Sequence, residues 1–204
     1  ANKGKKPYLL TLSPDTKPLG ALGYIRCAGE ILDQLNNQKQ SVEKIVVASG
    51  SAATHVGILL GLRLLGSEIP VHGICVRRDR KQQILRVEGI VRLAEHLIGC
   101  GKVVQGKDIK CHDDWLAPGY GKTNGLVHEA MVLAGSLEGM IVDPVYTAKS
   151  LAGAIGLSRL GVFNNSQNIL YLHTGGMPAL FAYEDEITEK LNEGLSIKYQ
   201  NNKP

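Results

Sequence analysis

The residues best suited to chemistry form a short turn of small and hydroxyl-bearing side chains after an apolar run. Residues 45–48 are mostly β-branched, which favours a strand, and helical spacing begins within 49–54. Backbone N–H groups at the start of a helix bind anions, and Ser49, Ser51 and Thr54 add hydroxyl donors. The turn therefore predicts a phosphate site. It matches neither standard glycine-rich phosphate motif, so a plain strand-to-helix connection stays the alternative.

The composition excludes several classes of function. The 204 residues are 44% hydrophobic and 21% charged, which is typical of a globular protein with one sizeable core. The net charge of +4 is modest, and the few aromatic residues argue against a nucleic-acid partner. The basic cluster at 77–81 is expected to face solvent. Four cysteines without a C-x-x-C pair indicate a reducing, cytoplasmic setting and no metal site, and no membrane span is expected.

Strand-like and helix-like segments alternate along the chain. The expected strands cover 7–12, 45–48, 71–76, 141–146 and 169–173, with one short strand in the irregular segment 102–123. The expected helices cover 20–35, 53–65, 79–98, 125–137, 149–160, 179–183 and 185–191. This order predicts an α/β fold of three layers, α/β/α, with a mainly parallel sheet. We expect a single α/β domain over 1–191 and a tail at 192–204.

Ligands of such sheets bind at the carboxyl ends of the strands. That rule brings together three segments that are far apart in the sequence, namely 49–54, 146–147 and 174–176. We therefore expect one composite site at this edge of the sheet.

The same segments carry a resemblance to a known family. Four motifs occur in the family's order and approximate spacing: VASGSAATHVG at 47–57, GYG at 119–121, DPVYTAK at 143–149 and LHTGGMPALFAY at 172–183. LGALGY at 19–24 matches as well, and the likeness spans about 7–183. The chain resembles the pyridoxal-phosphate enzymes that include D-cysteine desulfhydrase, 1-aminocyclopropane-1-carboxylate deaminase and L-cysteate sulfo-lyase. Several motifs in register are far more specific than one.

The resemblance implies a fold and a set of site residues. The fold is that of the tryptophan synthase beta-subunit-like enzymes (fold type II), here without the amino-terminal part, and the cofactor is pyridoxal 5'-phosphate. Tyr120 and Tyr146 would flank a small amino-acid substrate and act in catalysis. The residues expected to bind the cofactor are Ser49, Gly50, Ser51, Ala52, Ala53, Thr54, Thr147, Thr174 and Gly175.

One departure from the family pattern bears on the reaction. The cyclopropane deaminases have a glutamate after the tyrosine of the Asp-Pro-Val-Tyr motif, whereas this chain has Thr147. The resemblance therefore favours β-elimination from cysteine or a related amino acid, which releases sulfide or sulfite, ammonia and pyruvate. Cyclopropane ring opening is the alternative.

A second departure concerns the Schiff-base lysine, which the family carries ahead of every motif matched here. Lys149 corresponds to a lysine of the turn before a helix, not to that residue. We therefore expect the carboxyl-terminal part of a larger enzyme, which needs its amino-terminal half or a partner chain and forms a homodimer when complete. Alone, it is expected to aggregate or to require a partner. A non-catalytic phosphate-binding or cofactor-binding module and an unrelated nucleotide-binding domain are the alternatives from other classes.

Overall fold

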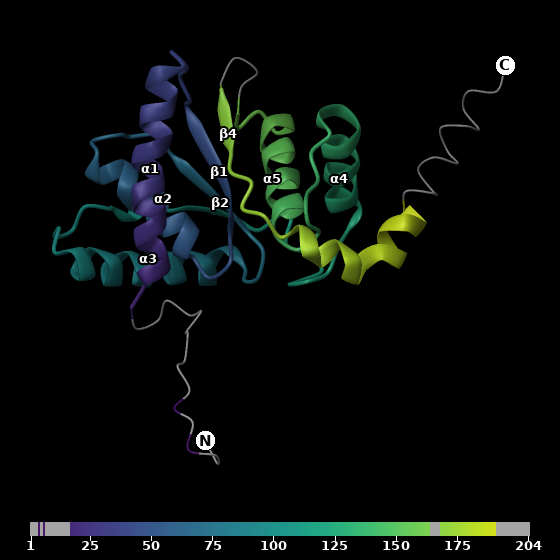
Figure 1. Cartoon of the computed structure of the whole chain (residues 1–204), viewed down its shortest axis with the longest axis horizontal. Coiled ribbons are helices and arrows are strands. Elements are labelled where there is room, and N and C mark those ends of the chain that lie inside the picture. The colour runs from purple at the N-terminus through teal and green to yellow at the C-terminus, as the bar shows by residue number, and fades with distance from the viewer. Residues whose placement is uncertain (1–3, 5, 7–16, 164–167, 191–204) are drawn as a thin grey trace.

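Four parallel strands form the central sheet, in the order β3-β2-β1-β4 (Figure 1). The computed structural model describes residues 4, 6, 17–163 and 168–190 of the chain. The strands are β1 (Lys44–Ser49), β2 (Val71–Cys75), β3 (Lys110–His112) and β4 (Ile169–Tyr171). All three pairings between neighbours are parallel, with Ile45 opposite Val71 and Leu170. The predicted parallel sheet is confirmed.

Helices cover both faces of this sheet, because its strands are apolar on both sides. Ile45 and Val47 pack with the helices of one face, whereas Val46 packs with Ile74 against the other. On the first side lie α1 (Leu19–Asn37), α2 (Ala53–Leu64) and α3 (Arg80–Ile98), and on the second α5 (Thr147–Arg159), with α4 (Gly125–Glu138) against α5 (Figure 1). This confirms the three-layer architecture. Among the described residues, no helix combines the length and apolar character of a membrane span.

The five long helices begin and end within two residues of their predicted limits. The Asp79 side chain caps α3 by accepting from the amide of Gln82 at 2.8 Å, and Gly99 ends the helix at φ 70°. The segment Met177–Tyr183 is a 3₁₀ helix, η2, and residues 184–190 continue as α-helix. A second 3₁₀ helix, η1, covers Gly106–Asp108.

Close packing of α1 on α2 fixes the element that begins at the predicted phosphate turn. A Cβ atom on Gly57 would lie 2.4 Å from the Cβ of Tyr24, and one on Gly61 would lie 2.6 Å from the carbonyl oxygen of Ile25. These two glycines therefore let the helices approach more closely than any side chain would permit.

The predicted strand at 141–146 is wrong. This segment is irregular and then turns into α5. Pro144 has no N–H to give to a sheet, and the Asp143 carboxylate takes the amides of Val145 and Tyr146 at 2.8 and 2.9 Å. The predicted strand 7–12 and the tail 192–204 lie outside the described residues.

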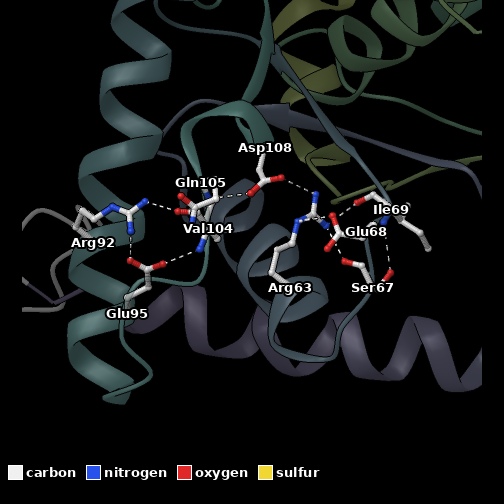
Figure 2. Close-up of polar contacts among 9 residues, drawn as sticks. All are labelled: Arg63, Ser67, Glu68, Ile69, Arg92, Glu95, Val104, Gln105 and Asp108. Carbon is white, nitrogen blue, oxygen red and sulfur yellow. Dashed lines mark hydrogen bonds and ion pairs between the residues drawn. The ribbon is translucent and has the colours of Figure 1, made fainter.

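Buried charges hold the loops at the amino ends of β2 and β3 (Figure 2). Arg63 lies 3.2 Å from a carboxylate oxygen of Asp108, and its guanidinium also donates to two carbonyls of the loop before β2. Arg92 pairs with Glu95, whose carboxylate accepts amides from the loop before β3. These contacts stabilise the edge of the sheet opposite the predicted site.

Candidate functional site

The turn between β1 and α2 has the backbone geometry of an anion site. Ala52 adopts a left-handed conformation at φ 81°, which is costly for a residue with a Cβ, and α2 begins at the next residue. The first amides of a helix have no intrahelical partner, and the helix dipole is positive there. Ser51 is exposed, and Gly50 and Thr54 are half-buried, so small groups and hydroxyls surround these amides. This donor set fits a phosphate.

A buried polar cluster holds the end of β1, just before this turn. The Ser49 hydroxyl lies 3.0 Å from Nδ1 of His55 and accepts from Nε2 of Gln83 at 2.9 Å. All three side chains are fully buried. The hydroxyl of Ser49 therefore has internal partners, and its contact with a cofactor stays a prediction.

Donors from the start of α3 and the loop before it hold the carbonyls of the turn. Gln83 and Arg78 both donate to the carbonyl of Gly50, at 3.2 and 3.0 Å, and Arg86 donates to that of Ser51 at 3.2 Å. The backbone of the turn is thus fixed from the side of α3, which preorganises it for a ligand.

The two tyrosines predicted to flank the substrate meet each other. Their hydroxyl groups share a hydrogen bond, and the guanidinium carbon of Arg77 lies 5.6 Å from the ring centroid of Tyr120. The bond from Tyr120, and then burial, raise the pKa of Tyr146 to about 12, although the charge of Arg77 opposes this. Tyr146 therefore keeps its proton at neutral pH and is able to act as a proton donor.

Asp143 organises the start of α5, where Tyr146 lies. Its buried carboxylate accepts from the amide of Thr147 at 2.8 Å and from the Thr147 hydroxyl at 2.7 Å, in addition to the amides of Val145 and Tyr146. The Thr147 side chain is fully buried. Its hydroxyl thus belongs to a capping arrangement, and its contact with the cofactor stays a prediction.

The turn after β4 docks on the same aspartate. Gly176 has φ 94°, and a Cβ atom there would lie 2.6 Å from Oδ1 of Asp143. His173 donates through Nε2 to the carbonyl of Ile141 at 2.8 Å and accepts at Nδ1 from the amide of Gly175 at 3.2 Å, so its partners assign the Nε2–H tautomer. The exposed Thr174 therefore stands on a turn that is fixed on both sides.

A continuous series of contacts thus joins the three predicted segments at the carboxyl edge of the sheet. The amide of Val76 donates to the carbonyl of Ser49 at 3.2 Å, which places the end of β2 beside the phosphate turn. Arg77 follows and lies over Tyr120, Tyr120 bonds to Tyr146, and Asp143 links that tyrosine to the turn at 174–176. The convergence expected from the parallel sheet is therefore present.

Sequence reasoning missed the residues that hold this site together. The basic cluster at 77–81 is mostly exposed, as expected, but Arg77 and Arg78 also contact site segments, which its sequence pattern does not indicate. Asp143 was assigned to a strand, although an Asp three or four residues before a helical pattern is a capping signal that would have identified its role. No group of three or more His, Cys, Asp or Glu in the described part of the chain is arranged to hold a metal ion.

The chain is similar to known proteins over most of its length. D-cysteine desulfhydrases of Salmonella paratyphi C and Salmonella choleraesuis are each 40% identical to the chain over 186 residues, which is 91% of this chain and 55% of theirs. The chain thus spans about half the length of these curated relatives.

Solved structures show the same fold. A crystal structure of an ACC deaminase homologue is 34% identical with a TM-score of 0.78, over 92% of this chain and 55% of that one. Diaminopropionate ammonia lyase from Escherichia coli, at 17% identity and a TM-score of 0.52, shares the fold over 83% of this chain and 47% of its own. The family described as "Pyridoxal-phosphate dependent enzyme" matches residues 1–175. The chain therefore belongs to this family, whose cofactor is pyridoxal phosphate.

Proposed function

We propose that this chain supplies the phosphate-binding turn and the two tyrosines of a pyridoxal-phosphate lyase. The reaction is β-elimination from cysteine or a related small amino acid, which yields sulfide or sulfite, ammonia and pyruvate. The observation that carries the proposal is the series of contacts from the turn at 49–54 through Arg77 and the Tyr120–Tyr146 pair to Asp143 and Gly176.

The residues of this edge suit the cofactor. The amides and hydroxyls of 50–54 would hold its phosphate, and Thr174 and Gly175 would lie near the pyridine nitrogen. When bound, the pyridoxal ring withdraws electrons from the substrate's Cα. A hydroxyl at the ring nitrogen holds a proton there less strongly than a carboxylate does. Tyr146, protonated at neutral pH, would give or orient a proton at the substrate together with Tyr120.

The substrate class follows from two observations. The relatives at 40% identity are D-cysteine desulfhydrases, and Thr147 stands where the cyclopropane deaminases have glutamate. Opening of a cyclopropane amino acid is the second candidate, because the structure at 34% identity is an ACC deaminase homologue.

Lys149 supports the idea that the Schiff-base lysine lies elsewhere. Its side chain is fully buried, and Nζ donates to the carbonyls of Leu116 and Gly119. We propose that the amine comes from the part of the relatives' length that this chain does not match, within one polypeptide or from a partner chain. The complete assembly would be a cytoplasmic homodimer.

Cofactor titration tests the phosphate site. We expect the chain to bind pyridoxal phosphate in competition with inorganic phosphate, followed by absorbance of the cofactor. Ser51→Asp adds a negative charge at the exposed turn and should weaken binding at least about tenfold, since two like charges about 4 Å apart near a protein surface repel each other by more than about 1.4 kcal/mol. The matched control is Ser136→Asp on the exposed surface of α4, which should leave binding unchanged.

Product assays then separate the alternatives. Sulfide and pyruvate from D- or L-cysteine support elimination, whereas ring opening of the cyclopropane substrate supports the second candidate. Cofactor binding without any turnover favours the non-catalytic module for this chain by itself. Binding of a nucleotide in preference to pyridoxal phosphate would overturn the proposal.

A further inference from the structure

Lys149 occupies a position that is unfavourable for a lysine. It is the third residue of α5, where the helix dipole is positive, and its side chain is fully buried. Burial lowers its pKa, and no ion pair to it is found between the described residues. A simple packing role at this position would be served better by an apolar side chain of similar size.

The contacts of Lys149 explain why an ammonium group is there. Nζ donates to the carbonyl of Leu116 at 3.0 Å and also to that of Gly119. Only a side chain with several donors satisfies two carbonyls at once, and Lys has three. Both carbonyls belong to the segment that leads directly into Tyr120.

Other anchors of this loop tie it to elements other than the start of α5. The Asn124 side chain, which caps α4, donates to the carbonyl of Ala117. The buried Trp115 ring packs on α5, where a Cβ atom on Gly156 would lie 2.1 Å from it. The Tyr183 hydroxyl donates to the carbonyl of Gly121. Lys149 is thus the described side chain that ties the residues just before Tyr120 to the helix that carries Tyr146.

We propose that Lys149 is a positioning residue that brings the hydroxyl of Tyr120 to that of Tyr146. The two side chains at 146 and 149 are about one helical turn apart at the start of α5. The first turn of this helix therefore carries Tyr146 and also holds the loop that carries Tyr120. The importance of this pair for catalysis rests on the proposed function, whereas the positioning itself does not.

Hydrogen exchange on the chain tests this role without any cofactor. Lys149→Met keeps the apolar stem and removes the donors, and we expect the amides of 116–122 to exchange at least about tenfold faster, since bonds from a charged donor are lost. Lys149→Arg restores a charged donor group and should return exchange to near the original rate. Lys102→Met, at an exposed lysine, is the control and should change nothing.

Two further measurements separate positioning from general stability. The chain has one tryptophan, so the fluorescence of Trp115 reports on the same loop. We expect Lys149→Met to change that emission while the melting temperature changes little, because removal of the buried charge and loss of the donor to two carbonyls act on stability in opposite directions. Unchanged exchange at 116–122, no rescue by arginine, faster exchange over the whole chain, or a variant that fails to fold would each overturn the proposal. A chain that binds no pyridoxal phosphate would refute the proposed function and leave this test intact.

Discussion

Polar side chains gather at both ends of the strands, and the two groups differ in what their partners are. At the amino end, charged groups bond to one another and to the backbone of neighbouring loops (Figure 2). At the carboxyl end, Tyr120 and Tyr146 are 48% and 37% exposed, and the first amides of α2 face no helical partner. Within the described ranges, the carboxyl end therefore presents exposed hydroxyls and helix-start amides to a ligand, whereas the donors of the amino-end cluster are engaged or buried.

The amino end shows what a purely structural polar cluster looks like. Glu95 is 4% exposed and accepts from the amides of Val103 and Val104 at 2.7 and 2.9 Å. Arg92 donates to the carbonyl of Val104 at 2.6 Å as well as to Glu95. The carboxylate, the guanidinium and the loop backbone are thus hydrogen-bonded to one another. This cluster fixes loop 99–109, and its polar groups are already engaged within the fold.

Backbone strain differs as well. Ala52 in the phosphate turn has φ 81°, the largest positive φ among the described non-glycine residues, whereas Lys39 before β1 has φ 53°, within the left-handed region that turns tolerate. Strain of this kind costs stability and persists where the surrounding structure over-determines it, which is common at ligand sites. The amino end would therefore respond to substitution through stability, and the carboxyl end through ligand binding.

The largest effect is expected for Asp108→Ala at the amino end. This change removes the buried anion that faces the guanidinium of Arg63, since the two side chains are only 8% and 9% exposed. The exposed Glu68, 3.9 Å from Arg63, compensates little, so the change should cost about 3 kcal/mol of unfolding free energy. Urea denaturation measures it. The exposed pair Arg26–Glu30 offers the control, because Glu30→Ala should cost less than about 1 kcal/mol. A loss below about 1 kcal/mol for Asp108→Ala would show that the amino-end cluster is not structural.

Sequence reasoning predicted the carboxyl-end site better than the amino-end cluster, for a physical reason. The site depends on strand ends, and hydrophobic periodicity locates strands such as 45–48 and 71–76 well. The pairing of Arg63 with Asp108 joins residues 45 apart in the chain, and no local pattern encodes it.

The wrong prediction of a strand at 141–146 has a different cause. Its apolar residues suited a strand, but capping of α5 by Asp143 competed for the same backbone amides. A buried carboxylate that accepts several amides outweighed the local strand preference. The motif resemblance still identified Tyr146, because a motif does not depend on the secondary structure assigned to it.

Acid titration tests whether a buried group of the sheet itself, rather than of the loops at its ends, also affects stability. His72 lies within β2, 5% exposed, with Nδ1 3.0 Å from Nε2 of His112, and burial followed by that neighbour lowers its pKa from 6.5 to about 3. Below pH 6.5 the unfolded chain therefore binds a proton at this histidine that the folded chain does not bind, so the free energy of unfolding falls as the pH drops. The loss should reach about 3 kcal/mol near about pH 4.

A variant isolates this contribution from that of other groups. His72→Phe removes the titrating ring and keeps an aromatic side chain against Phe163, which contacts His72 edge-on. The slope of unfolding free energy against pH should become flatter in the variant between about pH 4 and 6.5. Identical slopes in the two proteins would mean that His72 is protonated in the folded chain.

Gly176→Ala tests the turn after β4, at the carboxyl end of the strands. The new Cβ would lie 2.6 Å from Oδ1 of Asp143 at a φ of 94°, so we expect a loss of about 2 kcal/mol and weaker pyridoxal phosphate binding. Gly89→Ala in α3 is the matched control, because nothing lies within 4 Å of its Cβ position and helix propensity should raise stability by about 0.5–1 kcal/mol. Equal effects at both positions would remove the argument that Asp143 holds the 174–176 turn.

The smallest effects are expected for substitutions of two neighbouring alanines at the phosphate turn. Ala52→Gly relieves left-handed strain of about 1–2 kcal/mol, but it loses a buried methyl group and gives the unfolded chain more freedom, so we expect a net change close to zero. Ala53→Gly, one residue later in the first turn of α2, should cost about 0.5 kcal/mol or more, because the unfolded chain gains the same freedom and no strain is relieved. The denaturant midpoint should thus stay nearly unchanged for Ala52→Gly and fall for Ala53→Gly. If both moved down together, the strain at Ala52 would not set this turn apart from an ordinary strand-to-helix connection, and the contrast between the two ends of the sheet would rest on exposure alone.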